Sequence, residues 1–363
     1  MISERNILIW LNNLGISNNI IIKLYEYFDD LCELWYINEI TLLRCGFLKK
    51  ETVNKIIRHR SIEFIEMIFS NIDKYNINVI TILDDEYPHS LINVFDKPVV
   101  IYVKGDYTLE SDIAIGVVGS RKATPYGKWA CERFTKDLVN LGVTIVSGLA
   151  TGIDSIAHRT TVELGGKTIG VLGNGLDKIY PKSNVKLYNE VSRNGLILTE
   201  FPLGTEPFNY NFPQRNRIIA GLSCGVVVIE AKEKSGSLIT AHHALEQGKE
   251  IFALPGNINS IYSSGTNKLI KDGAKPLLSI DDILEEIYEL QLKMKENKKN
   301  DIDLSNLSED ERKIINLILE GPIHADLISL KSGMDISSVI SILTILELKG
   351  LVKELSARTF TTC

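Results

Sequence analysis

The pattern of apolar and polar positions divides the chain into three parts. In residues 1–75, apolar side chains recur at helical spacing, as at Ile21, Leu24 and Phe28, and two glycine turns interrupt the pattern. This spacing predicts a small domain of helical hairpins. Glycine turns between helices hold a DNA phosphate in some proteins and only pack helices in others, and the slight excess of acidic residues here favours packing.

Residues 76–290 change to short β-branched runs that alternate with helical stretches. Continuous apolar strands separated by helices are typical of a parallel sheet that is covered on both faces. We therefore predict a doubly wound α/β domain with a mostly parallel sheet, and helices over residues 126–142, 152–165 and 237–248. The expected strands are residues 78–83, 99–105, 112–119, 143–149, 167–173, 196–201, 224–231 and 250–256.

The last part begins after a polar, charged stretch. Residues 291–305 are predicted to be the end of a helix followed by a linker. Residues 306–363 show three amphipathic helical segments and then a short hairpin pattern, and Ser308 with Glu311 forms a capping-box pattern at the first of these helices. This order is typical of a winged helix-turn-helix domain.

The composition is that of an ordinary globular protein. The 363 residues are 44% apolar and 24% charged, and the net charge of −6 argues against a basic coat for nucleic acid but permits a local basic groove. The five cysteines stand far apart without paired spacing, which indicates reduced thiols rather than disulfides or a zinc site. The sequence shows no membrane-spanning apolar run and no signal peptide, so a cytoplasmic location without membrane contact is expected.

One turn follows an apolar strand and opens a helix. Residues 116–127 read GVVGSRKATPYG, which places Gly119, Ser120 and Arg121 at the end of the strand. A dinucleotide-binding turn would need glycine where Val118 stands and an acidic residue after the next strand, which is also missing. We therefore exclude a dinucleotide and expect no cofactor. Backbone N–H groups, a helix start and the Arg121 guanidinium instead favour a bound anion.

Four more turns of this kind follow other predicted strands. In a parallel sheet the carboxyl ends of the strands share one edge, where ligands bind. So many phosphate-competent turns exceed the needs of one nucleotide and predict a groove for a chain of phosphates. The candidate residues of these turns are Gly148 and Gly152; Gly173, Gly175 and Lys182; Arg215, Asn216 and Arg217; and Ser235, Gly236 and Ser237.

Each of these residues also has a structural interpretation. A glycine serves in a tight turn without any ligand, and Lys182 is equally consistent with a solvated surface lysine. Arg217 is a candidate for a buried ion pair with Glu200 or Glu230. The nearby aromatic side chains either stack on bases or pack in loops: Phe208, Tyr210 and Phe212.

Catalytic signals are weak. The six histidines are scattered, and no metal-ligand spacing or nucleophile motif is present. We predict neither a catalytic residue nor a metal site. Asp154, at a predicted helix start, is interpreted as a partner of the helix dipole, and Asp177 is expected to brace the turn after residue 173.

Four segments closely resemble the DprA/Smf family of DNA-processing proteins. They are residues 116–121, 147–181, 211–223 and 230–256, which carry the turns described above. The resemblance spans about 200 residues of the central part, and the first and last parts fit the family's three-part layout more loosely. It implies an extended Rossmann-like domain between a SAM/helix-hairpin-helix-like domain and a winged-helix-like (DML1-like) domain.

The resemblance implies a non-enzymatic protein that protects incoming single-stranded DNA in natural transformation and helps to load RecA recombinase onto it. It also implies a homodimer with contacts around residues 267–278, where Pro276 departs from the apolar residue usual in the family. It assigns DNA contacts to Arg121, in a Gly-Ser-Arg motif, and to Lys182, in a Tyr-Pro-Lys motif. The other candidates within family motifs are Gly119, Ser120, Gly148, Gly152, Asn174, Arg215, Asn216, Arg217, Ser235, Gly236 and Ser237.

Two other functions stay open. Residues 235–240 with Glu246 resemble the glycine-rich turn and glutamate of nucleotide phosphoribohydrolases, although the double glycine of that group is absent. A transcription regulator that reads duplex DNA through the last domain is the second alternative. Residues 301–363 carry ten acidic against six basic residues, whereas a duplex reader should present cations. We therefore expect a protein-interaction or regulatory role for that domain.

Overall fold

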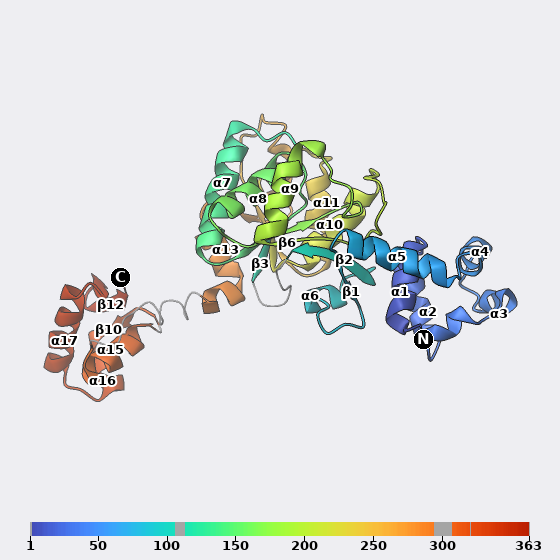
Figure 1. The fold of residues 1–363 in the computed structure, drawn as a ribbon. Helices are drawn as coiled ribbons and strands as arrows, with labels where there is room; N and C mark the ends of the chain where they lie inside the picture. The colour runs from blue at the N-terminus through green and yellow to red at the C-terminus, as the bar shows by residue number, and fades with distance from the viewer. Residues whose placement is uncertain (1, 106–112, 294–306, 320, 363) are drawn as a thin grey trace. The chain divides into compact units, whose positions relative to one another are not determined.

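The computed structural model describes residues 2–105, 113–293, 307–319 and 321–362. The chain forms two compact units, Met1–Ile287 and Tyr288–Cys363 (Figure 1). No single described helix is long and apolar enough to cross a membrane, and one bent pair of helices, Ala325–Ser332 with Ile336–Leu348, passes that test by length and composition alone.

The first unit begins with short helices, as the apolar spacing predicts. The side-chain oxygens of Ser3, Asn38 and Ser61 accept backbone N–H bonds and start three of these helices. Gly15 and Gly46 adopt positive φ in the turns between helices, which favours glycine. The elements are α1 (Glu4–Asn13), α2 (Asn18–Tyr27), the 3-10 helix η1 (Leu31–Trp35), α3 (Glu39–Arg44), α4 (Lys50–Arg58) and α5 (Ile62–Lys74).

A nine-stranded sheet forms the centre of this unit, in the order β1-β2-β6-β5-β4-β3-β7-β8-β9. Strands β3 to β8 run parallel, while β2 runs antiparallel to both of its neighbours, β1 and β6. All eight predicted strands are present, and the short edge strand β9 is an addition. The bounds are β1 (Asn78–Thr81), β2 (Val100–Gly105), β3 (Ala114–Val118), β4 (Thr144–Ser147), β5 (Thr168–Val171), β6 (Leu196–Thr199), β7 (Gly225–Val228), β8 (Glu250–Ala253) and β9 (Lys275–Pro276).

Helices cover both faces of the sheet, which confirms the doubly wound α/β prediction. From β3 the chain winds outward through β4, β5 and β6, and it then returns to place β7 and β8 on the other side of β3. Right-handed crossovers therefore put the helices of the two halves on opposite faces. These helices are α6 (His89–Ile92), α7 (Pro125–Asn140), α8 (Ile153–Glu163), the 3-10 helix η2 (Lys182–Asn184), α9 (Val185–Asn194), α10 (Asn211–Gly221), α11 (Gly236–Glu246), α12 (Ser264–Lys271) and α13 (Asp281–Glu286).

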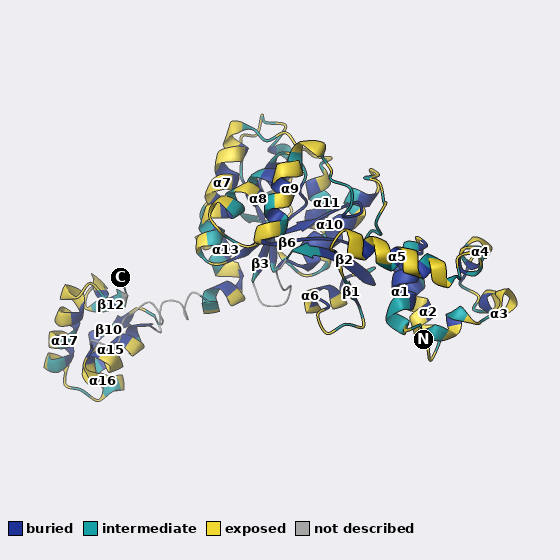
Figure 2. Ribbon diagram, in the orientation of Figure 1, coloured by how far each residue is buried: buried dark blue, intermediate teal, exposed yellow. Residues whose placement is uncertain are grey.

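The N-terminal helices share a hydrophobic core with the sheet (Figure 2). Trp10 of α1 belongs to the same buried cluster as Tyr102 of β2 and Ile197 of β6. The Asn12 side chain also donates a 3.2 Å hydrogen bond to the backbone carbonyl of Glu200, just beyond β6. The helical region is therefore joined to the sheet by both apolar and polar contacts.

The second unit has the winged helix-turn-helix plan expected from the sequence. The predicted capping box is present, because Ser308 N–H donates to Glu311 at 2.8 Å and Glu311 N–H donates to the Ser308 hydroxyl at 3.2 Å. The described part of the predicted linker ends at residue 293. The elements are α15 (Glu309–Leu319), β10 (Ile323–His324), α16 (Ala325–Ser332), α17 (Ile336–Leu348), β11 (Val352–Ser356) and β12 (Thr359–Thr362), with the strands in the order β10-β12-β11.

Candidate nucleic-acid interface

A groove opens where β3 and β7 lie side by side. The chain leaves these two parallel strands toward opposite faces of the sheet, so their loops diverge and leave a space between them. The groove has a volume of about 370 Å³ and gathers residues from the loops after five strands, β3, β4, β6, β7 and β8. Eight predicted site residues line it: Gly119, Ser120, Arg121, Arg215, Asn216, Ser235, Gly236 and Ser237.

Three predicted glycines let two of these loops approach each other closely. A Cβ on Gly119 would lie 2.7 Å from Ile153, and a Cβ on Gly148 would lie 2.5 Å from the Arg215 guanidinium. Gly152 has a φ of +82°, and a Cβ there would lie 2.2 Å from the carbonyl oxygen of Ser120. These glycines shape the groove by allowing close packing, and Gly148 and Gly152 are not among its lining residues.

A buried ion-rich cluster supports the floor of the groove. Arg215 is 4% exposed and donates to the backbone carbonyls of Gly148, at 3.0 Å, and Val171. Burial raises the pKa of Asp154, which the charge of Arg215 opposes, and burial lowers the pKa of Arg215 to about 10. Gly148 N–H donates to Asp154 at 3.2 Å. Asp154 thus holds the turn after β4 together with Arg215, a more specific role than the expected partner of a helix dipole.

Arg217 lies away from the groove. Its guanidinium donates to both carboxylate oxygens of Glu200, at 2.5 and 2.6 Å, and to the backbone carbonyl of Asp96 at 2.7 Å. Both charged side chains are nearly fully buried, at 5% and 3% exposure. The alternative of a structural ion pair with Glu200 is therefore the one that the structure shows. Glu230 instead accepts a hydrogen bond from the backbone N–H of Thr124, the N-cap of α7.

The N-terminus of α11 forms one wall of the groove. Ser235 is its N-cap and accepts a hydrogen bond from the backbone N–H of Ser237. Asn216 bridges two walls, because its oxygen accepts from Arg215 Nε at 3.2 Å and its amide donates to the Gly236 carbonyl at 3.2 Å. A helix start of this kind attracts an anion through its dipole and its unpaired backbone N–H groups.

Exposed cations and aromatic rings surround these backbone groups. Arg121 is exposed, and its guanidinium carbon lies 5.4 Å from the centre of the Phe212 ring. The Phe212 ring stacks with Tyr180 at 5.6 Å, and exposed Phe208 and Tyr210 stack on each other at 5.4 Å. The other exposed cations that line the groove are Lys122, Lys232 and Lys234. No ion pair joins these four cations to an acidic side chain among the described residues, so their charge faces an incoming ligand.

The turn after β5 carries the predicted DNA contacts Asn174 and Lys182, and neither of them lines the groove. Asn174 is buried, and its amide donates to the backbone carbonyls of Gly175 and Lys178, which fixes the turn from within. Asp177 accepts a 2.8 Å hydrogen bond from Gly204 N–H and so braces this turn, as expected. Lys182 is exposed at the start of η2.

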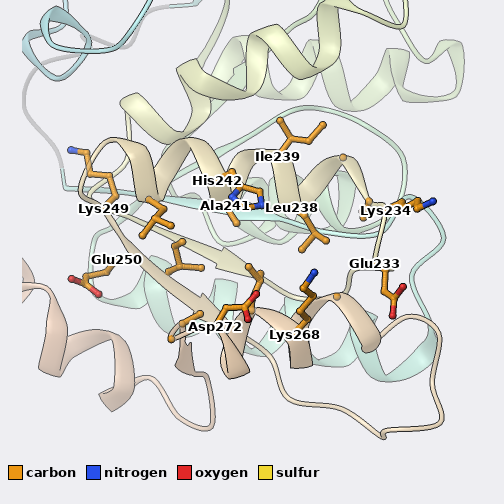
Figure 3. Close-up of a pocket in the computed structure, with 18 of the residues that line it drawn as sticks. Glu233, Lys234, Leu238, Ile239, Ala241, His242, Lys249, Glu250, Lys268 and Asp272 are labelled. Carbon is orange, nitrogen blue, oxygen red and sulfur yellow. The ribbon is translucent and has the colours of Figure 1, made fainter.

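A second hollow, with a volume of about 720 Å³, lies between α11, β8 and α12 (Figure 3). Leu238 and Leu269 contribute apolar walls. Lys268 and Asp272 of the α12 segment face it in Figure 3, so the hollow carries both signs of charge. Within the described residues, no group of three His, Cys, Asp or Glu side chains could hold a metal ion.

The sequence of the first unit matches known DNA-processing proteins. Residues 78–288 match the family model for DNA recombination-mediator protein A, and residues 301–358 match the DprA winged helix domain. The DNA processing protein DprA of Bacillus subtilis is 47% identical over 214 residues, which is 59% of this chain and 72% of that protein. Protein Smf of Escherichia coli is 38% identical over 287 residues, which is 77% of this chain and 74% of that protein.

Solved structures show the same fold. The X-ray structure of DprA from Streptococcus pneumoniae is 36% identical with a TM-score of 0.67, and the match covers 76% of this chain and 95% of that chain. A DprA structure from Helicobacter pylori, solved for its single-stranded DNA binding mode, is 31% identical with a TM-score of 0.54, covering 61% and 96%. The chain described here therefore belongs to the DNA recombination-mediator protein A family, also known as DprA/Smf.

Proposed function

We propose that this chain binds single-stranded DNA in the groove between the loops of β3 and β7. One observation carries the proposal: a helix N-terminus and four exposed cations without ion pairs among the described residues converge on one groove at the carboxyl edge of the sheet. Such a surface suits a row of phosphates better than one compact cofactor. The single-stranded DNA binding described for the Helicobacter pylori relative supports this assignment.

The proposed mechanism is electrostatic, with stacking as a second contribution. Arg121 and the groove lysines neutralise phosphates, and the backbone N–H groups at the start of α11 hold a further phosphate. Lys182 extends the cationic track beyond the groove. Phe208, Tyr210 and Phe212 offer ring faces to bases, and this contact accepts any base. Binding should therefore depend little on base order and strongly on salt.

We also propose that the bound strand is protected and handed to RecA recombinase during recombination or transformation, without catalysis by this chain. Membership of the recombination-mediator family supports this role. The phosphoribohydrolase alternative needs a glutamate beside the glycine-rich turn. Glu246 lies at the far end of α11 from that turn and does not line the groove, which weighs against hydrolysis.

The winged helix domain fits a protein-interaction or regulatory role better than duplex reading. The exposed side of α17 contains small polar and aliphatic side chains and the acidic Glu347, and it has no cation before Lys349. Phosphate contacts need cations, so this helix lacks what a duplex reader requires. The exposed residues of α17 are Ile336, Ser337, Ile340, Ser341, Thr344, Ile345, Glu347 and Leu348.

Our proposal for the second hollow is that another copy of the chain covers it, giving a homodimer through α11 and α12. The patch is apolar at its centre, and it carries Lys268 beside Asp272 and Lys249 beside Glu250. A two-fold interface brings a patch against itself, so a patch with both charge signs can be complementary to its own copy. Pro276 lies on edge strand β9, where it lacks an N–H donor, so side-chain packing rather than sheet extension would join the copies.

Binding of single strands and duplexes across a salt series tests the main proposal. We expect the full chain to bind a single-stranded oligonucleotide about tenfold more tightly than the matching duplex, with affinity falling steeply between about 50 and 200 mM salt. Combined Arg121→Ala and Lys182→Ala substitutions should weaken binding by about a hundredfold, because each removes a charged phosphate contact. Equal binding by the wild type and this double variant would reject the site.

The matched control for that experiment is Lys186→Ala. Lys186 is an exposed lysine of α9 that pairs with Glu190 on its own helix at 3.6 Å. Its removal changes the net charge by one unit without touching the groove, so the affinity should change little.

The dimer is tested by the molar mass of the chain in solution, measured by sedimentation. Leu245 lines the second hollow and is 65% exposed, so Leu245→Asp should place a charge in the interface and give monomers. Ile62→Asp, at a 58% exposed position of α5, should leave the dimer intact. A monomeric wild type would reject this interface.

A further inference from the structure

One face of α7 carries an exposed row of aromatic and basic side chains. Trp129, Arg133 and Lys136 recur at helical spacing, and Tyr126 lies one turn before them. The two aromatic side chains remain 52% and 45% exposed in the folded unit. Exposed aromatic surface of this kind marks an interaction site more often than an accident of packing.

The planar groups of this row are already ordered. The Tyr126 and Trp129 rings stack with centres 6.1 Å apart and planes 26° apart, and the Arg133 guanidinium carbon lies 5.5 Å from the Trp129 ring. The Tyr126 hydroxyl donates a 3.0 Å hydrogen bond to the Pro255 carbonyl, which anchors the start of the row. The protein side chains would therefore lose little conformational entropy when a ligand stacks on them.

Cations accompany the rings. A hollow of about 740 Å³ beside α7 and α8 is lined by Trp129 together with Arg133, Lys136 and Arg159. Three acidic side chains, Glu132, Asp137 and Glu163, also line it. No ion pair joins these cations to the acidic side chains within the described ranges, so their N–H groups are available to bind another molecule.

The row continues directly from the groove. The turn that supplies Arg121 and Lys122 to the groove leads into α7 at Pro125. The ten helical steps from Tyr126 to Lys136 extend the surface by about 15 Å along the helix axis. A strand that leaves the groove on this side meets Tyr126 first and then Trp129.

We propose that this face of α7 is a second contact for the same strand of single-stranded nucleic acid. Bases stack on Tyr126 and Trp129, while Arg133, Lys136 and Arg159 hold the adjoining phosphates. The inference rests on the proposed function of the groove. Stacked rings, cations that form no ion pair among the described residues, and continuity with the groove favour a nucleic acid here, and a protein partner is the competing occupant.

Two oligothymidylates of different length distinguish the groove contact from the α7 contact. One of about 6 nucleotides reaches the groove alone, and one of about 15 nucleotides reaches both the groove and α7. Anisotropy of a labelled strand gives the affinity. Intrinsic fluorescence reports on Trp129, because the other two tryptophans, Trp10 and Trp35, lie in the N-terminal helical region and are buried or half-buried. We expect the long strand alone to quench the emission.

Trp129→Ala in the full chain should weaken binding of the long strand by about tenfold and leave binding of the short strand unchanged. Trp129→Phe should restore most of the affinity without the quenching, because it keeps a ring face. Phe95→Ala, at an 86% exposed aromatic position outside this row, is the matched control and should change neither affinity.

Two outcomes would overturn the inference in different ways. If Trp129→Ala binds both strands like the wild type and the long strand causes no quenching, then α7 is not a nucleic-acid contact and the row belongs to a protein partner. If the wild type binds neither strand, the groove itself is misassigned, and the proposed function fails together with this extension.

Discussion

Three arginines in the motif segments have three different environments. Arg121 is exposed at the groove, Arg215 is buried beside Asp154 beneath it, and Arg217 is buried against Glu200 behind it. Only Arg121 is free to hold a phosphate without breaking internal contacts. Arg215 shapes the turn that presents the ligand, and Arg217 joins α10 to the end of β6.

The buried pair of Arg217 and Glu200 gives a stability prediction. Glu200→Gln leaves the buried Arg217 charge with only the more distant carboxylate of Asp96, at 3.9 Å, so we expect the free energy of unfolding in urea to fall by about 3 kcal/mol. Glu190→Gln, which removes the exposed partner of Lys186, should change it by less than about 1 kcal/mol. Comparable small effects from both substitutions would show that the buried pair contributes little to stability.

His158 gives a pH prediction. Its imidazole is fully buried, with a 2.7 Å hydrogen bond to the Thr168 hydroxyl, and burial lowers its pKa from 6.5 to about 3. Between these two values the unfolded chain binds a proton that the folded chain does not, so stability should fall as pH falls from 6.5 toward 3. Above pH 6.5 His158 is neutral in both the folded and the unfolded chain, so it no longer makes stability depend on pH.

The test for His158 compares urea unfolding of the wild type and His158→Gln from pH 7 to pH 4. The variant should lose less stability across this range. Asp154 acts in the opposite sense, because its raised pKa favours proton uptake by the folded chain as pH falls. Parallel pH profiles for the two proteins would contradict the assignment to His158.

At the scale of elements, the groove depends on a close contact between the turns after β3 and β4. Gly152→Ala forces a side chain into a backbone with φ of +82° and into contact with the Ser120 carbonyl. We expect a loss of about 2 kcal/mol or more in the free energy of unfolding, together with weaker DNA binding. Gly165 also has a positive φ, of +68°, but open space around it, so Gly165→Ala should cost only about 1 kcal/mol and leave binding unchanged. Equal losses in both variants would show that the contact with Ser120 is unimportant.

The elements themselves were largely predictable from the sequence. Continuous apolar runs such as residues 114–118 identify buried parallel strands, and the turns after them share one edge because of that topology. The two-residue strand β9 escaped prediction because two residues carry no periodic signal. The antiparallel direction of β2 depends on chain connectivity that local patterns do not record.

The candidate site was less predictable than the fold. The sequence motifs identify Arg121, Arg215 and Arg217 equally as candidate DNA contacts. Only the folded chain distinguishes the one exposed guanidinium from the two buried ones. Lys122 and Tyr262 line the groove without standing out in any motif. Lys232 and Lys234, which stand two residues apart just before the start of α11, were the feature of the sequence that could have identified the groove lysines.

At the scale of the whole molecule, the two compact units should unfold separately. The three tryptophans all lie within Met1–Ile287, where the N-terminal helices share a core with the sheet. Tryptophan emission should therefore show one cooperative transition in urea, while far-UV circular dichroism should add a second transition from the winged helix domain. Two transitions in the tryptophan signal would mean that the N-terminal helices unfold on their own.

We propose that the strand-end loops of the sheet together form one track for a single strand of DNA. The most direct measurement is photocrosslinking of the full chain to an oligonucleotide that contains 5-iododeoxyuridine, with the crosslinked peptides identified by mass spectrometry. We expect crosslinks to the aromatic residues of the groove loops, Phe208, Tyr210, Phe212 and Tyr262. Crosslinks confined to the N-terminal helices or to the winged helix domain would contradict this proposal.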